Sequence, residues 1–453
     1  MFISSGKPAN NLRIGSELIN SITVYNIRYP FNQWNTPSIS TIKPTLHTQG
    51  FPPLDLSNHP CLNIFFTQFP QRLLLSPRIN KKGFIISNMK VSIAQEKLAK
   101  ALNLIKDVAS SRNELAILNN ILLRTDGGRL LIAGTNLEIA STQYVGAKID
   151  QPGSITIPAR LVSEFITNLP SGTVELETKD SHLNITSGKF SSVINGVIAD
   201  EYPELPTVDE AAAIRYEITA GDLKKAINQT KIAVSSDTTR AVLTGIYWQT
   251  HEGYLYLAAT DGYRLAEKKM MKSDSELKAI IPASTLAEVG KSADDEEQLT
   301  ILFDDTQVCF QTDNMEIVSR LIDGKFPDYK QLIPATSDIE IKIKKADFSR
   351  ITKIAALFAR ESGGGITLTA SKDKSLLSIH SIASELGENT SEAAAEISAD
   401  GQITLNSRYL TEVLNVIDDD DIVFSFNGKL SPCVIREQVK NPDYTHIIMP
   451  LKS

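Results

Sequence analysis

Two runs of acidic residues are the first candidates for chemistry in this chain. Residues 418–421 are four aspartates, and residues 294–297 read Asp, Asp, Glu, Glu. Carboxylates are the ligands that divalent metal ions prefer, and metal-dependent enzymes that act on nucleic acids use them. Consecutive side chains on a turn point in different directions, so neither run converges on one ion. We interpret both runs as solvated turns and predict no metal site.

Other catalytic patterns are missing from the sequence. No P-loop is present, and the glycines at 363–365 read as a loop after a helix. The six histidines are scattered, and the three cysteines are too far apart for a metal site or a disulfide framework, which favours a reducing, cytoplasmic compartment. No nucleophile with its base can be identified. We therefore expect a protein that is not an enzyme and uses no cofactor.

Basic side chains, in contrast, recur at one place in a repeated sequence, where they could bind phosphate. The copies read SIAQEKLAKALNLIKDVASS from Ser92, EITAGDLKKAINQTKIAVSS from Glu217 and KIKKADFSRITKIAALFARE from Lys342, so they start 125 residues apart. Basic residues outnumber acidic ones in each copy, although the chain has a net charge of −7. In a single helix, lysines on a solvated face would explain this excess. Its recurrence in three copies favours a surface that faces a polyanion.

A second repeated signature keeps nearly the same spacing. It reads TIPARLVSEF from Thr156, IIPASTLAEV from Ile280 and TLNSRYLTEV from Thr404. Glutamates occupy equivalent places in the three copies, namely Glu164, Glu288 and Glu412. Repeats of this length are large enough to be domains with their own cores. The sequence therefore predicts three similar domains, at residues 89–208, 209–336 and 337–453.

Each repeat contains the same order of expected elements. A short strand precedes the basic helix, whose apolar residues form one stripe, as Leu98, Leu102 and Ile105 do in the first copy. Strands separated by turns follow, and a second helix begins at the Pro-Ala or Asn-Ser of the second signature. Further strands complete the repeat. The fold class is therefore α+β, with three repeated domains of antiparallel sheet plus two helices.

Residues 1–88 differ from the repeats. They contain nine of the twenty prolines, and eight Lys and Arg against two acidic residues, without a sustained helical or strand period. We expect this segment to be disordered or an upstream extension of the reading frame, rather than a transit peptide, and Met89 to begin the folded protein. The most apolar stretch, from Cys61, is far shorter than the roughly 20 residues of a membrane span. We expect no association with a membrane.

Stretches from all three repeats resemble the bacterial DNA sliding clamps, the beta subunits of DNA polymerase III. They are ELAILNNILL at 114–123, IAGTNLEI at 132–139, TIPAR at 156–160, ATDGYRLA at 259–266, LIDGKFPDY at 321–329 and IIMPLKS at 447–453. The resemblance covers residues 89–453 and implies the DNA clamp fold and a homodimeric, closed ring. Such a ring encircles double-stranded DNA and tethers the replicative polymerase without chemistry of its own. The resemblance further implies a clamp loader, and polymerases and repair proteins that bind through short peptides.

Helix dimensions agree with a ring of two chains. Two helices per domain, spaced about 9 Å apart, would leave a hole of about 6 Å for three domains and about 23 Å for six. Only the larger hole admits a DNA duplex. Three domains per chain therefore favour a closed dimer with twofold symmetry.

The resemblance also implies a pocket for partner peptides between the second and third domains. We expect apolar peptide side chains to pack there against leucines and Met449, and Arg264, Thr260 and Asn406 to bond the polar groups of the peptide. Carried over by motif, the pocket residues are Leu243, Thr260, Gly262, Tyr263, Arg264, Leu265, Pro327, Leu332, Asn406, Tyr409, Met449, Pro450 and Leu451.

Contacts to DNA are expected mainly from the first helix of each repeat, and Arg112 and Arg240 match DNA-facing positions of the family. The expected contacts, independent of base sequence, are Lys97, Lys100, Arg112, Lys224, Lys225, Arg240, Arg350, Lys353 and Arg360. Two alternatives stay open. One is a metal-dependent nucleic-acid enzyme that uses Asp261 and the acidic run at 418–421. The other is a repeat scaffold unrelated to DNA, in which the basic helices could be neutralised without effect.

Overall fold

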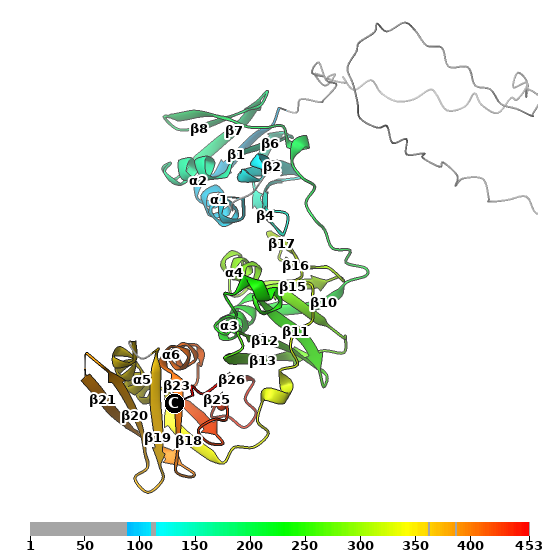
Figure 1. The fold of residues 1–453 in the computed structure, drawn as a ribbon. Coiled ribbons are helices and arrows are strands. Elements are labelled where there is room, and N and C mark those ends of the chain that lie inside the picture. Colours follow the sequence, from blue (N-terminus) through cyan, green and yellow to red (C-terminus); the bar gives the residue numbers. More distant parts are fainter. Residues whose placement is uncertain (1–87, 110–114, 361–362, 386, 453) are drawn as a thin grey trace, which may run out of the picture. The chain divides into compact units, whose positions relative to one another are not determined.

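The computed structural model describes residues 88–109, 115–360, 363–385 and 387–452 (Figure 1). The first repeat begins with a strand and a helix, as its sequence signature predicts. Its elements are β1 (Lys90–Ala94), α1 (Gln95–Ala109), η1 (Ala116–Asn119), β2 (Asn120–Asp126), β3 (Arg129–Thr135), β4 (Ile139–Gly146), β5 (Lys148–Gln151), β6 (Ser154–Pro158), α2 (Ala159–Thr167), β7 (Thr173–Lys179), β8 (His182–Ser187), β9 (Phe190–Asn195) and η2 (Ala199–Glu201).

The second repeat follows the same order. Its elements are β10 (Ile214–Thr219), α3 (Ala220–Lys231), η3 (Thr238–Leu243), β11 (Gly245–His251), β12 (Tyr254–Thr260), β13 (Arg264–Lys272), β14 (Lys278–Pro282), α4 (Ala283–Ser292), β15 (Gln298–Phe303), β16 (Gln307–Gln311), β17 (Met315–Arg320) and η4 (Lys330–Leu332).

The third repeat ends the chain. Its elements are β18 (Ile339–Lys344), α5 (Lys345–Ala359), β19 (Gly365–Ser371), β20 (Leu376–Ala383), β21 (Gly387–Ala394), β22 (Glu396–Ile397), β23 (Gly401–Asn406), α6 (Ser407–Val416), β24 (Asp421–Phe426), β25 (Cys433–Glu437) and β26 (Tyr444–Ile448).

The second helix of each repeat begins where the signature predicts. Pro158 and Pro282 are the N-caps of α2 and α4, where proline suits the helix start because no hydrogen-bond donor is lost. Asn406 caps α6, and its side chain accepts a hydrogen bond from the backbone N–H of Arg408 at 2.9 Å. Among the first helices, the residues Leu98 and Leu102 of α1 are buried, which confirms the expected apolar stripe.

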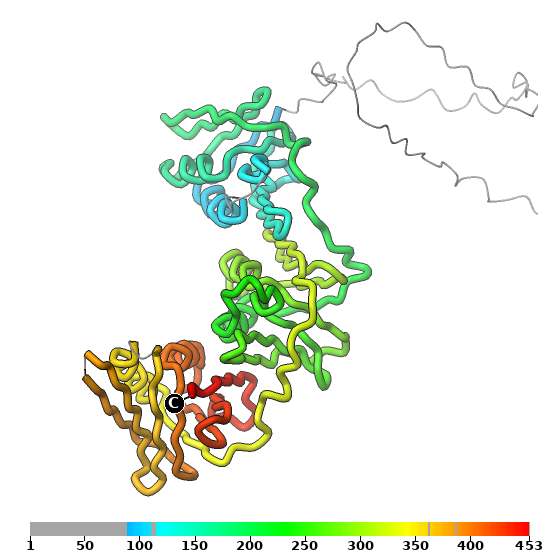
Figure 2. The backbone as a smooth tube through the Cα atoms, viewed as in Figure 1, coloured from blue at the N-terminus to red at the C-terminus, as the bar shows by residue number. Residues whose placement is uncertain are grey.

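The strand pairs of the described residues are all antiparallel, and they form four sheets. Two of these sheets cross the boundaries between repeats. β4 of the first repeat pairs with β17 of the second, and β13 of the second pairs with β26 of the third. In Figure 2, the yellow-green segment of β17 lies beside the cyan segment of β4, and the red segment of β26 lies beside the green segment of β13. The expected α+β class is confirmed, with strand pairing that continues from repeat to repeat.

The buried apolar residues do not divide into three separate cores. The first repeat has a core of its own, in which Leu102, Ile105 and Ile132 are fully buried. The cores of the second and third repeats merge into one cluster that extends from Tyr216 to Ile448. The expectation of one self-contained core per repeat is therefore correct for the first repeat only. Strand pairing alone does not explain the merger, because β4–β17 also continues a sheet between repeats and leaves the first core separate.

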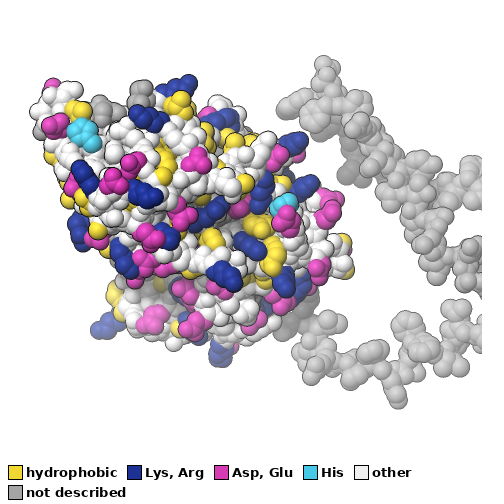
Figure 3. Space-filling view, turned by 90° about the horizontal axis from the view of Figure 1, so that it is seen from below, with side chains coloured by type: hydrophobic (Ala, Val, Ile, Leu, Met, Phe, Trp, Pro, Cys, Tyr) yellow, Lys and Arg dark blue, Asp and Glu magenta, His cyan; other side chains and the backbone are white. Residues whose placement is uncertain are grey.

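In the part of the chain that the structure describes, no helix is both long enough and apolar enough to cross a bilayer. The molecular face in Figure 3 carries Lys and Arg side chains interspersed with Asp and Glu. Charges of both signs are therefore mixed on that face, rather than gathered into one field.

Candidate functional site

The turn between β12 and β13 carries the motif that predicted the peptide pocket. Thr260 donates its hydroxyl to the carbonyl of Arg264 at 2.6 Å and accepts the N–H of Gly262 at 3.1 Å. The carboxylate of Asp261 accepts the N–H groups of Tyr263 and Arg264 at 2.9 and 3.0 Å. Gly262 has φ +92°, a backbone conformation that residues with a Cβ rarely adopt. These bonds fix the turn in one conformation and leave Tyr263 63% exposed at its tip.

Arg264 lies beneath this turn and joins the second repeat to the third. Its side chain is 5% exposed, and its Nε donates to Asp261 at 3.1 Å. One Nη donates to the carboxylate of Glu412 on α6. The guanidinium also lies over the ring of Tyr409, 4.3 Å from its centroid. A buried guanidinium needs such partners because its desolvation is costly, so Arg264 acts here as a structural link between the repeats.

The end of the chain is attached to the same turn. After β26, the N–H of Met449 donates to the carbonyl of Tyr263 at 2.8 Å. The N–H of Leu451 donates to the carbonyl of Thr404 at 2.9 Å. Chain ends are commonly mobile unless such bonds attach them. The apolar terminus therefore becomes a fixed wall of the site, with the Met449 side chain 37% exposed.

Leucine side chains form the floor of the site. Leu243 and Leu265 are 6% and 2% exposed and belong to one apolar cluster with Ile447 and Phe326. Leu332, the last residue of η4, is 46% exposed. Pro327 is also exposed, and Pro450 and Leu451 are half-buried. Most of the predicted pocket residues thus meet around one turn with a packed leucine floor, whereas Pro327 lines a groove at the junction of the first and second repeats.

The polar pocket residues differ from expectation in what they bond. We expected Arg264, Thr260 and Asn406 to contact a bound peptide. In the structure, Arg264 and Thr260 hold the turn, and Asn406 caps α6. The physical reason is that buried polar groups need partners within the fold. These three residues therefore build the site.

The predicted DNA contacts on the first helices are placed as expected, but several of them are paired with acids. Lys100 of α1 lies 3.2 Å from Asp294, and Lys225 of α3 lies 2.7 Å from Asp418. Hydrogen bonding to Asp418 raises the pKa of Lys225, so this lysine stays charged. Two further pairs join Lys224 to Asp295 at 2.5 Å and Arg350 to Asp347 at 2.9 Å.

Other predicted contacts are unpaired or lie elsewhere. Lys97, Lys353 and Arg360 are exposed, and none of them forms an ion pair with another described residue. Arg240 lies in η3, where its guanidinium donates to Asp237 at 3.1 Å and to the carbonyl of Asp261 at 3.3 Å. It therefore stands beside the peptide site and apart from the helices. Arg112 lies outside the described residues.

The acidic runs at 294–297 and 418–421 are mostly exposed, with Glu297, Asp419 and Asp421 half-buried, and they also supply partners to the basic helices. The pairs of Lys100 with Asp294 and of Lys225 with Asp418 join one repeat to the next. Within the described ranges, no three His, Cys, Asp or Glu side chains are grouped so that they could hold a metal ion. The runs thus act as helix partners across the domain junctions.

Sequence reasoning missed residues that hold the site together. Asp261 and Glu412 anchor Arg264, and Thr404 receives the chain end. Glu412 carried a usable signal, because it repeats with Glu164 and Glu288. The counterpart Glu288 is 6% exposed, and burial raises its pKa. Two of the three carboxyl groups at this repeated position, Glu288 and Glu412, thus form ion pairs, whereas Glu164 is exposed.

Comparison with known proteins identifies related families and structures. The family models for the DNA polymerase III beta subunit match all three repeats, the N-terminal domain at residues 89–206, the central domain at 217–328 and the C-terminal domain at 330–452. The chain is 33% identical over 381 residues to the beta sliding clamp of Bacillus subtilis strain 168, an alignment that covers 81% of this chain and 100% of that protein. It is 31% identical over 379 residues to the beta sliding clamp of Staphylococcus aureus strain N315, with the same coverage.

Solved structures agree in fold. The crystal structure of the DNA polymerase sliding clamp from Bacillus subtilis superimposes with a TM-score of 0.77 at 32% identity, covering 81% of this chain and 100% of that one. The DnaN sliding clamp from Pseudomonas aeruginosa bound to griselimycin gives a TM-score of 0.76 at 26% identity and the same coverage.

Proposed function

The chain belongs to the DNA polymerase III beta subunit family, the bacterial sliding clamps, and is a DNA polymerase processivity factor; we propose that it works as a homodimeric ring around duplex DNA. One observation carries the proposal. Two junctions between repeats are formed within the chain by equivalent strand pairs, β4–β17 and β13–β26. The strands that would form a third such pair lie at the edges of their sheets. The protein needs no catalysis for this role.

The third junction follows from the repeat alignment. β21 is the counterpart of β4 and β13, and β9 is the counterpart of β17 and β26. Both β9 and β21 lie at the edge of their sheets. An edge strand with unpaired backbone groups is a template for pairing with another chain. We infer that β9 of one subunit pairs with β21 of a second copy, and the same pairing in return closes a ring with twofold symmetry.

The register of this pairing can be derived from the two junctions within the chain. Met315 lies opposite Gln143, and Tyr444 lies opposite Lys268. The corresponding pair at the third junction joins Phe190 to Ser391 of the partner subunit. Phe190 and the nearby Val193 are 51% and 61% exposed in the single chain, as expected for residues that a partner covers.

Helix contacts support the same junction. α1 contacts α4 and α3 contacts α6, so the first helix of each repeat packs on the second helix of the next. The counterpart contact would join α5 to α2 of the second copy. α5 exposes Ile354 and Leu357, which are 38% and 53% exposed. Burying both would contribute up to about 1.5–3 kcal/mol each, the range for a side chain that is fully exposed at the start.

DNA would be held inside the ring by charge and by enclosure. The first helices carry the unpaired cations Lys97 and Lys353, and Arg360 follows α5. Phosphate contacts of this kind carry no sequence information and weaken with salt. We propose that these residues contact the backbone first, and that Lys100, Lys225 and Arg350 do so only by exchanging a carboxylate for a phosphate.

Polymerases, repair proteins and the clamp loader would bind through short extended peptides at the Arg264 turn. Their apolar side chains would cover the rim formed by Tyr263, Leu332 and Met449, over the Leu243 and Leu265 floor. Each well-buried side chain contributes about 1.5–3 kcal/mol. Ordering a flexible peptide costs part of this free energy, so affinity for a single site should be near micromolar.

The mass in solution tests the ring. We expect twice the mass of one chain by light scattering, and a monomer for Phe190→Glu, because a charge at a buried edge position opposes pairing. Leu430→Glu is the matched control, since Leu430 is 73% exposed and outside the proposed junction. A monomeric wild-type chain, or a Phe190→Glu variant that stays dimeric, would contradict the proposal. A loaded dimer should remain on circular DNA and leave after linearisation.

A further inference from the structure

The two junctions within the chain share a backbone hydrogen bond. At the second junction, the N–H of Met449 donates to the carbonyl of Tyr263 at 2.8 Å. At the first junction, the N–H of Arg320 donates to the carbonyl of Glu138 at 2.9 Å. The donors lie at the ends of the strands that pair between repeats, since Met449 follows β26 and Arg320 ends β17. The acceptors lie in the turns before the strands that pair with them, since Tyr263 precedes β13 and Glu138 precedes β4. The first junction therefore contains a structural counterpart of the peptide site.

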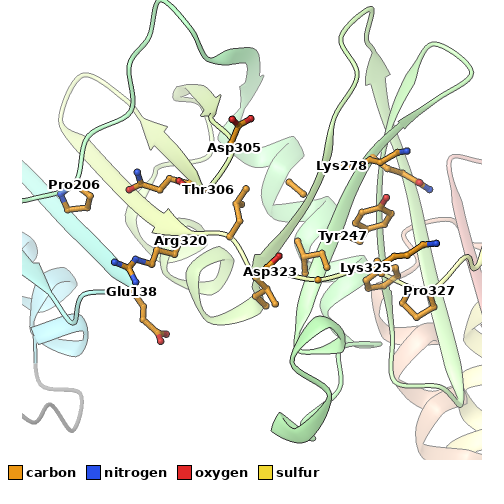
Figure 4. Close-up of a pocket in the computed structure, with 18 of the residues that line it drawn as sticks. Glu138, Pro206, Tyr247, Lys278, Asp305, Thr306, Arg320, Asp323, Lys325 and Pro327 are labelled. Carbon is orange, nitrogen blue, oxygen red and sulfur yellow. The ribbon is translucent and has the colours of Figure 1, made fainter.

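A groove of about 1260 Å³ lies at this first junction (Figure 4). Its lining comes from the turn at 135–138, from the chain at 320–330 and from β11 and β14. The segments 135–138 and 320–322 correspond to 260–263 and 449–451 of the peptide site. The groove thus uses the same parts of the repeat, with different side chains.

Apolar side chains form part of the groove. Tyr247 stacks on Phe326, with ring centroids 4.7 Å apart and planes 12° from parallel. Ile280 is 3% exposed and lies beside Ile322, whose N–H donates to the Ile280 carbonyl at 2.8 Å. An apolar side chain of a ligand could pack against Tyr247 and Ile322, both of which are half-buried.

The edge of a sheet also borders the groove. β14 is the last strand of its sheet, and it pairs with β11 on one side only. The bond from Ile322 to Ile280 shows that this outer edge accepts backbone hydrogen bonds. In an antiparallel strand the outward-facing groups alternate, so Lys278 presents its backbone on the same edge as Ile280. An extended peptide can add to such an edge as a further strand.

The two sides of the groove carry opposite charges. Lys278 and Lys325 lie on the side of β11 and β14, whereas Glu138 and Asp305 lie on the other side, together with one cation, Arg320 (Figure 4). None of the two lysines and two acids forms an ion pair with another described residue. The remaining ionisable lining residues are Glu204, Asp323, Asp328 and Lys330, of which Lys330 is paired with Glu267 at 2.5 Å.

The peptide site has a different rim. Tyr263 and Met449 occupy the positions that Glu138 and Arg320 occupy in the groove. The peptide site at the Arg264 turn therefore offers apolar contacts at positions where the groove offers charges. A ligand that suits one of them is poorly matched to the other, because an unpaired charge must then be desolvated.

We propose that this groove binds an extended peptide with an apolar centre, an acidic residue on one side and a basic residue on the other. The acidic residue pairs with Lys278 or Lys325, and the basic residue pairs with either Glu138 or Asp305, which lie apart on the other side (Figure 4). The apolar centre covers Tyr247 and Ile322, and the peptide backbone lies along β14. This site is separate from the Arg264 turn, and the inference stands whether or not the chain encircles DNA.

Three labelled pentapeptides with blocked ends test the proposal by fluorescence anisotropy on the full chain at low salt. They are Glu-Val-Leu-Val-Lys, Glu-Val-Leu-Val-Glu and Lys-Val-Leu-Val-Lys. We expect the first to bind about fivefold more tightly than either uniformly charged peptide, since both exposed charge pairs are then satisfied. The double variant Lys278→Glu, Lys325→Glu should reverse the preference in favour of the peptide with two lysines.

Matched variants locate the binding. Lys272→Glu changes an exposed lysine of β13 outside the groove and should leave the preference unchanged. Met449→Ala, which alters the other site, should also leave it unchanged. Equal affinity for the three peptides, or the same response to the Lys272 and Lys278 variants, overturns the proposal. Displacement of the peptide by a single-stranded oligonucleotide would instead assign the groove to nucleic acid and would overturn it too.

Discussion

Lys225 and Asp418 form an ion pair at 2.7 Å that repeats, one domain further along, the pair of Lys100 and Asp294. Both pairs join the first helix of one repeat to the loop after the second helix of the next. The third member of the series is Arg350, which pairs instead with Asp347 of its own helix. Two lysines that the sequence assigned to DNA are thus also contacts between domains.

Removing the acid should release Lys225 for DNA. We expect Asp418→Asn to raise affinity for a short duplex by roughly twofold to fivefold at low salt, and to steepen the salt dependence, because one more cation can contact phosphate. Asp373→Asn is the control, because it removes an exposed acid from the turn between β19 and β20. Anisotropy titrations at several salt concentrations give both quantities, and equal effects of the two substitutions would show that only net charge matters.

Glu412→Gln should weaken the link between the second and third repeats. Arg264 is 5% exposed and would keep only Asp261 as a charged partner. The cost in free energy of unfolding should be roughly 1–3 kcal/mol, and affinity for partner peptides should fall with it. Glu164→Gln changes the exposed counterpart in α2 and should cost less than about 0.5 kcal/mol. Urea denaturation of the two variants compares them directly, and similar losses would argue against the link.

Met449→Ala separates binding from stability. The side chain is 37% exposed, so its removal should change the free energy of unfolding by less than about 1 kcal/mol. Peptides that use the Arg264 turn should nevertheless bind about tenfold more weakly, because they lose an apolar contact at the rim. Val439→Ala is the control, because it shortens another exposed apolar side chain of the third repeat, at a residue that is 49% exposed. Calorimetry that found unaltered affinity for Met449→Ala would place the peptide elsewhere.

Burial lowers the pKa of His446 to about 3, and the charge of Arg264 acts in the same direction. The unfolded chain therefore binds one more proton below pH about 6.5, and this residue lowers stability as the pH falls from about 6.5 toward 3, by up to about 1.4 kcal/mol per pH unit. His446→Gln should show a shallower loss between pH 6 and 4 in denaturant titrations, whatever its stability at pH 7.

Residues 1–88 should be dispensable for the clamp. The family match begins at Met89, and the aligned relatives are covered over their full length by 81% of this chain. Deletion of residues 1–88 should leave the melting temperature and the mass in solution unchanged. A loss of several degrees would mean that the segment packs on the body.

Much of the fold could be predicted because its signals are local. The repeated signatures placed the helix starts at Pro158, Pro282 and Asn406 correctly, since capping depends on neighbouring residues. The strand pairs between repeats could not be predicted, because pairing joins residues far apart in sequence, as Ser141 and Ile317 are in β4 and β17. Residues 387–394 are polar and gave no strand signal, and they form β21 only through their pairing with β20.

In the candidate site, too, local features could be predicted from the sequence and contacts between distant residues could not. The motifs located its turn, its leucine floor and its apolar chain end. They did not show that the guanidinium of Arg264 is hydrogen-bonded to Asp261 and Glu412. A motif identifies the residue type, but the partners of its side chain depend on residues far away in the sequence. Arg240 is the clearest case, since its hydrogen bond to Asp261 places it beside the peptide site.

The merged core of the second and third repeats bears on how the chain folds as it is synthesised. The first repeat has its own core and can complete it once that repeat, about a third of the repeated sequence, has left the ribosome. The second repeat shares its core with β26, which ends five residues before the C-terminus. Its sheet therefore waits for the last strand, and until then the outer edge of β13 is without its partner. A nascent chain that carries the first two repeats has therefore completed two of its three repeats in sequence, but it holds only one closed core and one open sheet.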